Sequence, residues 1–421
     1  MLAPASTGML DIHVSDPETH TVSKVSAFVD FKVHTSTDFE RFASRDFFVR
    51  RRYRDFVWLR TQLMSSFPGA IVPPLPPADK PYKGDDRFSA QFVQRRQAGL
   101  ELFLRRVAMH PALAKSDDLL TFLEAKVWEL ETAKNASTAT WTSSLRDSTD
   151  ASLKRVSAAL STKTPDDDEI ERLRAFSSEH YKVVSAAEAA HLTTVSTLQL
   201  QADDLSHLGP AFDLVSQSER ELSLPFTHMA KELDALRELF LKQVQAEHVS
   251  GLTSLLSFNE GMAASLKQVL KNRDYALTQY NKASTLLDAR SQERMRWQAA
   301  QAGQPTRAPP GEGSSPPKGV INQIYARVKE QLVEDPQKGA KLQQQVTEAE
   351  QALKETKEEW ESISGSVSAE ARAFHAMTNA DFSGGLRAHV QQQLDFESEK
   401  QRIWTELLRV FEEAAPPPAI P

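Results

Sequence analysis

The chain of 421 residues has no cysteine, only 15 glycines and no long uninterrupted hydrophobic run. The lack of cysteine excludes a disulfide scaffold, a thiol nucleophile and any cysteine-ligated zinc or iron–sulfur site. No run approaches about 18 apolar residues, and the first ten residues lack the basic flank and apolar stretch of a signal peptide. We therefore expect a soluble, cytosolic protein whose contact with any membrane is peripheral.

The motifs of common catalytic and cofactor sites are also missing from the sequence. The glycines and lysine of residues 311–319 lack P-loop spacing, and two prolines there forbid the helix that should follow a P-loop. The 11 histidines show no H-E-x-x-H spacing, and there is no G-x-S-x-G nucleophile motif. The sequence therefore predicts that the protein is not an enzyme and uses no metal or cofactor.

Charge is distributed unevenly along the chain. Residues 1–130 carry 18 Lys and Arg against 16 Asp and Glu, whereas the whole chain has a net charge of −7. The first third is thus slightly basic and the remainder is acidic. A protein that binds nucleic acid through bulk charge would show a basic excess. We therefore expect no nucleic acid partner, and any anion site must be local.

The first third of the chain combines strand and helix patterns. Alternating apolar residues predict strands, and apolar residues on one face at helical spacing predict helices. The expected strands cover 9–14, 24–35 and 47–53, and the expected helices cover 56–67, 88–109 and 116–126, with a proline-rich loop at 72–77. Sheet first and helices afterwards indicate a compact α+β domain.

The rest of the chain is predicted to be helical. Thr164 and Pro165 are typical of a helix start, and we expect Gly209-Pro210 to interrupt this helix. Further helices are expected over about 212–249 and 252–302, a loop over 303–319 and a last helix from Pro336. In that last helix two columns of apolar residues repeat every seven positions, which predicts a seam buried against another helix; these columns are Leu342, Ala349 and Ile363, and Val346, Leu353, Trp360, Val367 and Phe374.

The segment Arg50-Arg51-Arg52-Tyr53-Arg54 stands at the expected junction between a strand and a helix. Guanidinium groups suit phosphate because their forked donors bind two oxygens at once, and a tyrosine offers a flat face to a sugar or inositol ring. The alternative is an exposed strand edge that is protected from aggregation by charge. This segment alone does not decide between the two interpretations.

Residues downstream favour the phosphate interpretation. The arginine cluster is followed by the proline-rich loop, by lysines and by Arg95-Arg96 on a helix. This order, R-R-Y-x-D-F, then prolines, a lysine and F-x-x-R-R-x-x-L, resembles the phox-homology (PX) domain of sorting nexins over residues 9–128. The resemblance implies that Arg52 contacts the 3-phosphate of phosphatidylinositol 3-phosphate, that Tyr53 packs on the inositol ring, that Arg54 adds positive potential and that Arg95 binds the 4- and 5-hydroxyls.

The resemblance also implies a lysine that reaches the 1-phosphate, and Lys80 is the first candidate. The family usually places this lysine two residues after the last proline of a P-x-x-P turn. Counted from Pro73–Pro76, Lys80 comes two residues late. Lys83 therefore remains an alternative to Lys80.

The second half resembles the BAR domain of PX–BAR sorting nexins, on the pattern of Trp360, Phe374, Asp381-Phe382 and Trp404. The resemblance implies long antiparallel coiled helices that form a homodimer or a heterodimer with another BAR sorting nexin. An amphipathic stretch with Trp141 and Leu145 lies where that subfamily carries a membrane-inserting helix. The expected domains are a tail at 1–8, the PX domain at 9–128, a linker with this helix at 129–165, the BAR domain at 166–414 and a tail at 415–421.

Together these features predict a phosphoinositide-binding peripheral protein on the cytosolic face of early endosomes. It would sense or induce membrane curvature, support retrograde transport in tubular carriers and associate with a retromer-type cargo complex, as the resemblance implies. Two PX pockets on one dimer would engage the membrane at high effective concentration. The rival hypothesis is a coiled-coil cytoskeletal or tethering adaptor without lipid specificity.

Overall fold

The computed structural model describes residues 9–23, 26–76, 88–126, 131, 167–301 and 336–414. Lys80, Lys83, Trp141 and Leu145, and the loop expected at 303–319, lie outside the described residues. Among the helices of the described part, none is both long and apolar enough to cross a membrane. The described chain forms two compact units, of which the second comprises Leu270–Ser368 and the first comprises the rest.

An antiparallel sheet of three strands begins the first unit. Its strands are β1 (Leu10–Ser23), β2 (Ser26–Thr37) and β3 (Asp46–Arg52), in the order β1-β2-β3. The predicted strands are confirmed, but β1 is much longer than the apolar pattern of 9–14 indicated. The extension pairs with β2 through its backbone after a register shift beside Asp16, whose φ of 46° lies in the left-handed region.

Three helices cover one face of the sheet. They are α1 (Tyr53–Ser66), α2 (Ala90–Met109) and α3 (Asp117–Glu124), and a short 3₁₀ turn, Leu113–Lys115, precedes α3. An apolar core fills the space between sheet and helices, and its members include Ile12, Phe31, Val33, Phe56, Leu59, Leu63, Leu100, Phe103, Val107 and Phe122. These helices are the predicted ones, and this confirms the predicted α+β fold.

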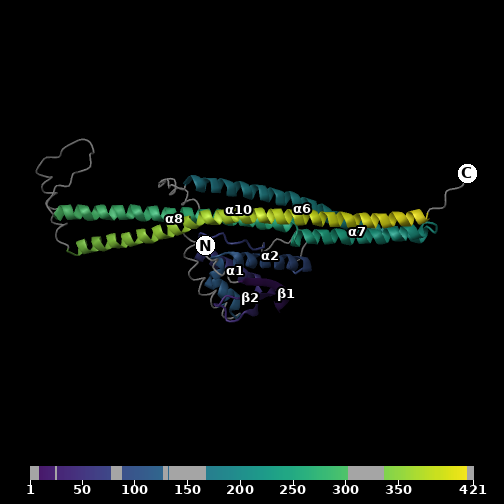
Figure 1. Cartoon of the computed structure of the whole chain (residues 1–421), viewed down its shortest axis with the longest axis horizontal. Coiled ribbons are helices and arrows are strands. Elements are labelled where there is room, and N and C mark those ends of the chain that lie inside the picture. Colours follow the sequence, from purple (N-terminus) through teal and green to yellow (C-terminus); the bar gives the residue numbers. More distant parts are fainter. Residues whose placement is uncertain are drawn as a thin grey trace, which may run out of the picture. The chain divides into compact units, whose positions relative to one another are not determined.

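Four long helices follow: α6 (Asp167–Ser218), α7 (Ser223–Val249), α8 (Leu252–Gln301) and α10 (Pro336–Ala414). Within the first unit, α7 runs beside the end of α10, and α1 and α2 lie on one side of them (Figure 1). The break predicted at Gly209-Pro210 was wrong, because α6 continues through Pro210 to Ser218. A Cβ on Gly209 would come within 3.4 Å of the Ala230 carbonyl oxygen of α7. Close packing between α6 and α7 thus overrides the helix-breaking tendency of proline.

The seam predicted for the last helix is buried. Leu342, Val346, Ala349, Ile363 and Val367 are all at most 4% exposed. Within the second unit α10 packs against α8, where Trp360 stacks on Tyr280 with ring centroids 5.7 Å apart. The seam is therefore covered by a helix of the same chain.

Polar contacts dock the N-terminal domain on the helices of the first unit. Glu370 of α10 accepts a hydrogen bond from the Ile71 amide at 2.9 Å and one from His110 Nε2 at 2.9 Å. Nearby, Arg106 of α2 is ion-paired with Asp381 of α10. His110 also stabilises the turn after α2, since its Nδ1 accepts from the amides of Ala112 and Leu113.

Candidate functional site

The arginines of the cluster fall into different environments because β3 alternates its side chains between the two faces of the sheet. Arg51 points into the domain and is only 1% exposed. Its guanidinium donates to the backbone carbonyls of Phe122 at 2.7 Å, Ala125 at 2.5 Å and Arg50 at 3.0 Å. Burial lowers the pKa of Arg51 to about 10, although the nearby Asp55 carboxylate opposes this shift. Arg51 therefore holds the end of α3 and is not available to a ligand.

Arg50 points to the opposite face, where acidic groups of β1 and β2 neutralise it. Its guanidinium lies 2.6 Å from Asp30 and 2.7 Å from Glu18. With His20, these two carboxylates have the geometry of a possible metal site. The Arg50 cation already occupies their oxygens, so we assign the group a structural role. The interpretation of a charged strand edge thus holds for Arg50.

Arg52 and Tyr53 stand where β3 passes into α1. The Arg52 amide donates to Asp55 Oδ2 at 2.8 Å and so caps the helix start. The Arg52 guanidinium lies 3.5 Å from Asp55 and 2.6 Å from Glu131. Arg54 follows on the exposed side of α1. The Arg52 guanidinium thus already pairs with a carboxylate, so its donors are able to bind an oxyanion.

The proline-rich loop closes over Tyr53. The Tyr53 hydroxyl donates to the Pro76 carbonyl at 2.6 Å, and Arg60 Nε donates to the Pro73 carbonyl at 2.9 Å. Burial lowers the pKa of Arg60. A Cβ on Gly99 of α2 would come within 2.9 Å of the Pro76 ring, so only glycine lets the loop lie this close. The loop is therefore fixed between α1 and α2.

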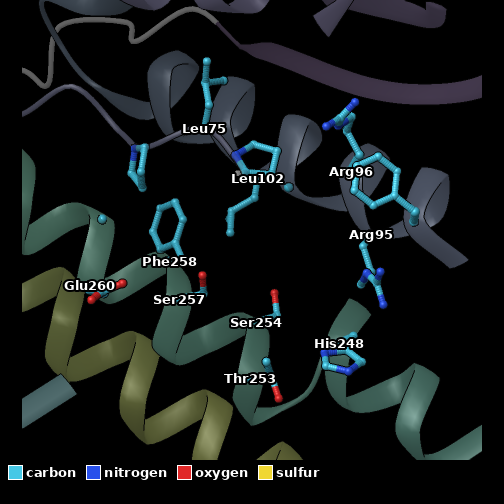
Figure 2. A pocket seen from close by; sticks show the side chains of 15 residues that line it. Leu75, Arg95, Arg96, Leu102, His248, Thr253, Ser254, Ser257, Phe258 and Glu260 are labelled. Carbon is cyan, nitrogen blue, oxygen red and sulfur yellow. The ribbon is translucent and has the colours of Figure 1, made fainter. Parts of the chain in front are cut away.

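Arg96 is the arginine of α2 that lies at Tyr53. Its guanidinium carbon is 4.4 Å from the Tyr53 ring centroid and 4.3 Å from that of Phe92. Arg95 and Arg96 both line a neighbouring cavity, in which Arg95 extends toward His248 while the Arg96 guanidinium points away from that residue (Figure 2). The structure thus places Arg96 over the ring of Tyr53, the residue that follows Arg52, and directs Arg95 elsewhere.

The spacing of the buried residues along α2 would have indicated Arg96 rather than Arg95. Arg96 lies four residues after Phe92 and four before Leu100, and both of these are buried against the domain core. Arg95 lies four residues before Gly99, on the next face of the helix. The motif contains two adjacent arginines, so only the register of the buried residues distinguishes them.

The long helices carry many lysines and arginines, and the structure shows whether two of them on α8 could reach a membrane surface. Arg273 is only 2% exposed, so it cannot reach a membrane surface. Lys267 lies over the ring of Tyr181, with Nζ 4.0 Å from the centroid. These two residues of α8 are therefore engaged within the fold.

Comparison with known proteins shows which family the chain resembles. A family model for the PX domain matches residues 40–126. Over 97% of its length the chain is 26% identical to Sorting nexin-4 of Colletotrichum higginsianum, and it covers 85% of that protein. The chain thus contains a PX domain and is similar to sorting nexins over nearly its whole length. Sorting nexin 1 of Arabidopsis thaliana is 40% identical over 29% of this chain and 30% of the plant protein. The cryo-EM structure of the SNX-BAR Mvp1 tetramer aligns with 94% of this chain and 100% of that chain, at 15% identity and a TM-score of 0.47.

These similarities confirm the predicted resemblance to sorting nexins and the predicted order of a PX domain followed by a long helical region. Sorting nexins of this type are non-enzymatic adaptors of membrane traffic and peripheral membrane proteins of endosomal compartments. Their PX domain is the phosphoinositide-binding module. Of the residues that the sequence assigned to the headgroup, the described ones lie inside the matched region: Arg52 at the end of β3, Tyr53 and Arg54 at the start of α1, and Arg95 on α2.

Proposed function

We propose that this chain is a sorting nexin that binds phosphatidylinositol 3-phosphate through Arg52, Tyr53 and Arg96, on the cytosolic face of early endosomes. The observation that carries the proposal is the Arg96 guanidinium over the Tyr53 ring, next in sequence to Arg52, whose own guanidinium already pairs with a carboxylate. Arg52 would take the 3-phosphate in place of Glu131, and the Tyr53 ring would support the inositol. Arg96 replaces Arg95 as the residue for the ring hydroxyls.

The other predicted lipid contacts remain part of the proposal. Arg54 is exposed beside Tyr53 and adds positive potential at the membrane. Lys80 or Lys83 would supply the contact with the 1-phosphate, and Trp141 with Leu145 would insert into the bilayer. The role in curvature, retrograde transport and association with a retromer-type cargo complex follows from the family resemblance.

Liposome cosedimentation of the full chain tests the lipid site. We expect Arg96→Ala to weaken binding to vesicles with phosphatidylinositol 3-phosphate roughly tenfold to a hundredfold, since hydrogen bonds from charged donors contribute about 1.5–3 kcal/mol. Arg95→Ala should leave this binding nearly unchanged. Arg105→Ala is a matched control, because Arg105 lies on the same helix but pairs with Glu101 at 3.0 Å. Equal loss in all three variants would show that the Arg96 contribution is only bulk charge.

We also propose that the helices assemble with a second BAR sorting nexin chain, a copy of this chain or a relative. Within the first unit α10 leaves large apolar side chains exposed in two runs, 386–394 and 404–411, at spacings of three or four residues within each run. These are Leu386, Val390, Leu394, Trp404, Leu408 and Phe411, with Leu200, Leu208 and Leu214 exposed on α6. So many large exposed apolar side chains on packed helices are typical of an interaction surface.

Sedimentation equilibrium tests the assembly. Val390→Glu with Leu408→Glu should turn a dimer into a monomer, because each buried carboxylate would lack a partner in the interface. The exposed ion-pair variant Lys357→Glu is the control for added negative charge. A wild-type chain that sediments as a monomer, alone and with a related chain, would refute the proposal.

A further inference from the structure

A cavity of about 260 Å³ lies where the PX domain meets the corner between α7 and α8, and we call it the corner cavity. α2 and the proline-rich loop form one wall, and the end of α7 and the first turns of α8 form the other (Figure 2). Neither Arg52 nor Tyr53 lines it. Its lining residues are Pro74, Leu75, Pro76, Phe92, Arg95, Arg96, Gly99, Leu102, His248, Thr253, Ser254, Ser257, Phe258, Glu260 and Gly261.

The proline-rich loop acts as the spacer that makes this cavity. A Cβ on Gly261 of α8 would come within 2.5 Å of Pro74, and a Cβ on Gly99 of α2 within 2.9 Å of Pro76. Two glycines thus seat the two proline rings on opposite helices. The rigid rings keep α2 and α8 apart beyond this contact, so the cavity is built into the fold of the first unit.

The charge of the lining favours an anion. Two arginines, Arg95 and Arg96, line the cavity together with one carboxylate, that of Glu260, and of the two it is Arg95 whose guanidinium extends from α2 toward His248 (Figure 2). Glu260 is already engaged, because its charge and its hydrogen bond with the Tyr181 hydroxyl raise the pKa of Tyr181. Arg95 is half-buried, which lets its guanidinium reach both the cavity and the solvent. An anion that enters would therefore meet an excess of positive charge.

Hydroxyl groups add donors opposite the arginines. Figure 2 shows the Ser254 and Ser257 hydroxyls pointing from α8 toward α2, with Arg95 to one side of them, extending from α2 toward His248. Thr253 also lines the cavity and is only 2% exposed, and its Oγ1 has no hydrogen-bond partner among the described residues. Rotation about χ1 would exchange this hydroxyl with the methyl group without loss of a hydrogen bond. A buried hydroxyl without a partner favours a ligand that supplies one.

The backbone of α8 contributes as well. Thr253 and Ser254 belong to the first turn of a 50-residue helix, whose amide groups have no acceptors within the helix and carry a partial positive charge. The Leu252 amide is taken by Glu247, but this carboxylate is fully buried on the other side of the turn and is held by His191 and His389 at 3.0 and 3.2 Å. The Glu247 carboxylate is thus engaged with these two histidines.

We propose that the corner cavity is a second anion site, which binds a phosphate monoester between Arg95 and the hydroxyls of Ser254 and Ser257. Phosphate fits this donor set better than a carboxylate does, because a phosphate monoester presents three acceptor oxygens to a fork of guanidinium donors and two hydroxyls. The apolar side chains at the other end, Leu75, Leu102 and Phe258, would contact the ring or chain that carries the phosphate. The ligand is either a soluble phosphate ester or the headgroup of an anionic lipid.

Calorimetric titration of the full chain with inositol hexakisphosphate tests the site. The chain should carry Arg52→Ala, which removes the proposed headgroup contact, so that only the corner cavity remains. We expect one ligand per chain, and we expect added Arg95→Gln to weaken binding roughly tenfold to a hundredfold. Ser254→Asp should weaken it similarly while keeping the helix folded, since an acidic residue in the first turn stabilises a helix.

Arg105→Gln is the matched control and should bind like the parent. Equal affinity in Arg95→Gln, Ser254→Asp and Arg105→Gln chains would overturn the proposal, as would the absence of binding both to inositol hexakisphosphate and to phosphatidylcholine vesicles that contain phosphatidic acid. Binding of the soluble probe that depends on Arg95, with vesicle binding independent of Arg95, assigns a soluble ligand. Vesicle binding of the Arg52→Ala chain that is lost with Arg95→Gln assigns a lipid headgroup.

Discussion

Replacement of Glu370 by alanine should release the PX domain from the helices without unfolding it. Glu370 lies on α10 and accepts the hydrogen bonds from Ile71 and His110 that were described above. Burial alone would raise the pKa of Glu370, but these two hydrogen bonds outweigh it and hold the pKa below its ordinary value. The carboxylate is therefore ionised near neutral pH, and its stabilising effect is lost as the pH falls through this lowered pKa.

The size of the effect follows from the two donors that the variant leaves behind. A buried donor without an acceptor costs about 1–3 kcal/mol. The Ile71 amide would bear this cost in full, whereas His110 is 18% exposed and can be partly hydrated. We therefore expect Glu370→Ala to destabilise the docked arrangement by about 2–4 kcal/mol.

Hydrogen exchange measured by mass spectrometry reports this opening directly. Peptides that span residues 67–72 and 107–114 should exchange roughly 30- to 1,000-fold faster, because about 1.4 kcal/mol corresponds to a factor of ten. Peptides of β2 and β3 should keep their rates, since the sheet core does not depend on Glu370. The control is Glu361→Ala, which removes an exposed pair with Lys357 at 3.6 Å that contributes less than about 1 kcal/mol. Equal exchange in both variants would refute the role assigned to Glu370.

Two further predictions concern the lipid site and the proline-rich loop. Glu131→Gln should increase affinity for phosphatidylinositol 3-phosphate in cosedimentation, because Arg52 then loses a carboxylate that competes with the phosphate; unchanged or weaker binding would contradict this role. Gly261→Ala should lower stability in urea unfolding, since the new Cβ meets the rigid Pro74 ring at 2.5 Å. Gly384→Ala, where no described atom beyond its own helix lies within 4 Å of a Cβ, should raise stability by about 0.5–1 kcal/mol, and the same sign for both variants would refute the spacer role.

The sequence predicted those parts of the fold that depend on local periodicity. Buried apolar residues at regular spacing located β2, α1 and the seam of α10. The second half of β1 was missed because Asp16, Glu18 and His20 are polar, and the strand is held there by backbone pairing with β2. The break expected at Pro210 was absent because tertiary packing on α7 decides the local structure there. The local pattern of residues along the sequence gives no information on either of these non-local contacts.

In the candidate site, too, the local motif was predictable and the non-local contacts were not. The motif located the strand end and the arginine pair of α2, but it did not show that Arg51 is buried or that Arg50 is neutralised. These outcomes depend on α3, β1 and β2, which approach only in the folded chain. The Gly384-Gly385 pair is a further example: a Cβ on Gly385 would lie 2.5 Å from Leu255 of α8. The close approach of two helices explains this glycine, and no local rule indicates it.

The loop of residues 71–76 connects lipid recognition with docking on the helices. On one side its Pro76 carbonyl accepts the Tyr53 hydroxyl, and on the other its Ile71 amide donates to Glu370 while Pro74 rests on Gly261. A headgroup that orders Tyr53 therefore also orders the loop in the conformation that the helices require. Coupling between two binding equilibria is reciprocal, so docking on the helices must strengthen headgroup binding by the same factor by which the headgroup strengthens docking. The proposed headgroup site and the docking of the PX domain on the helices of the first unit thus depend on the same six residues.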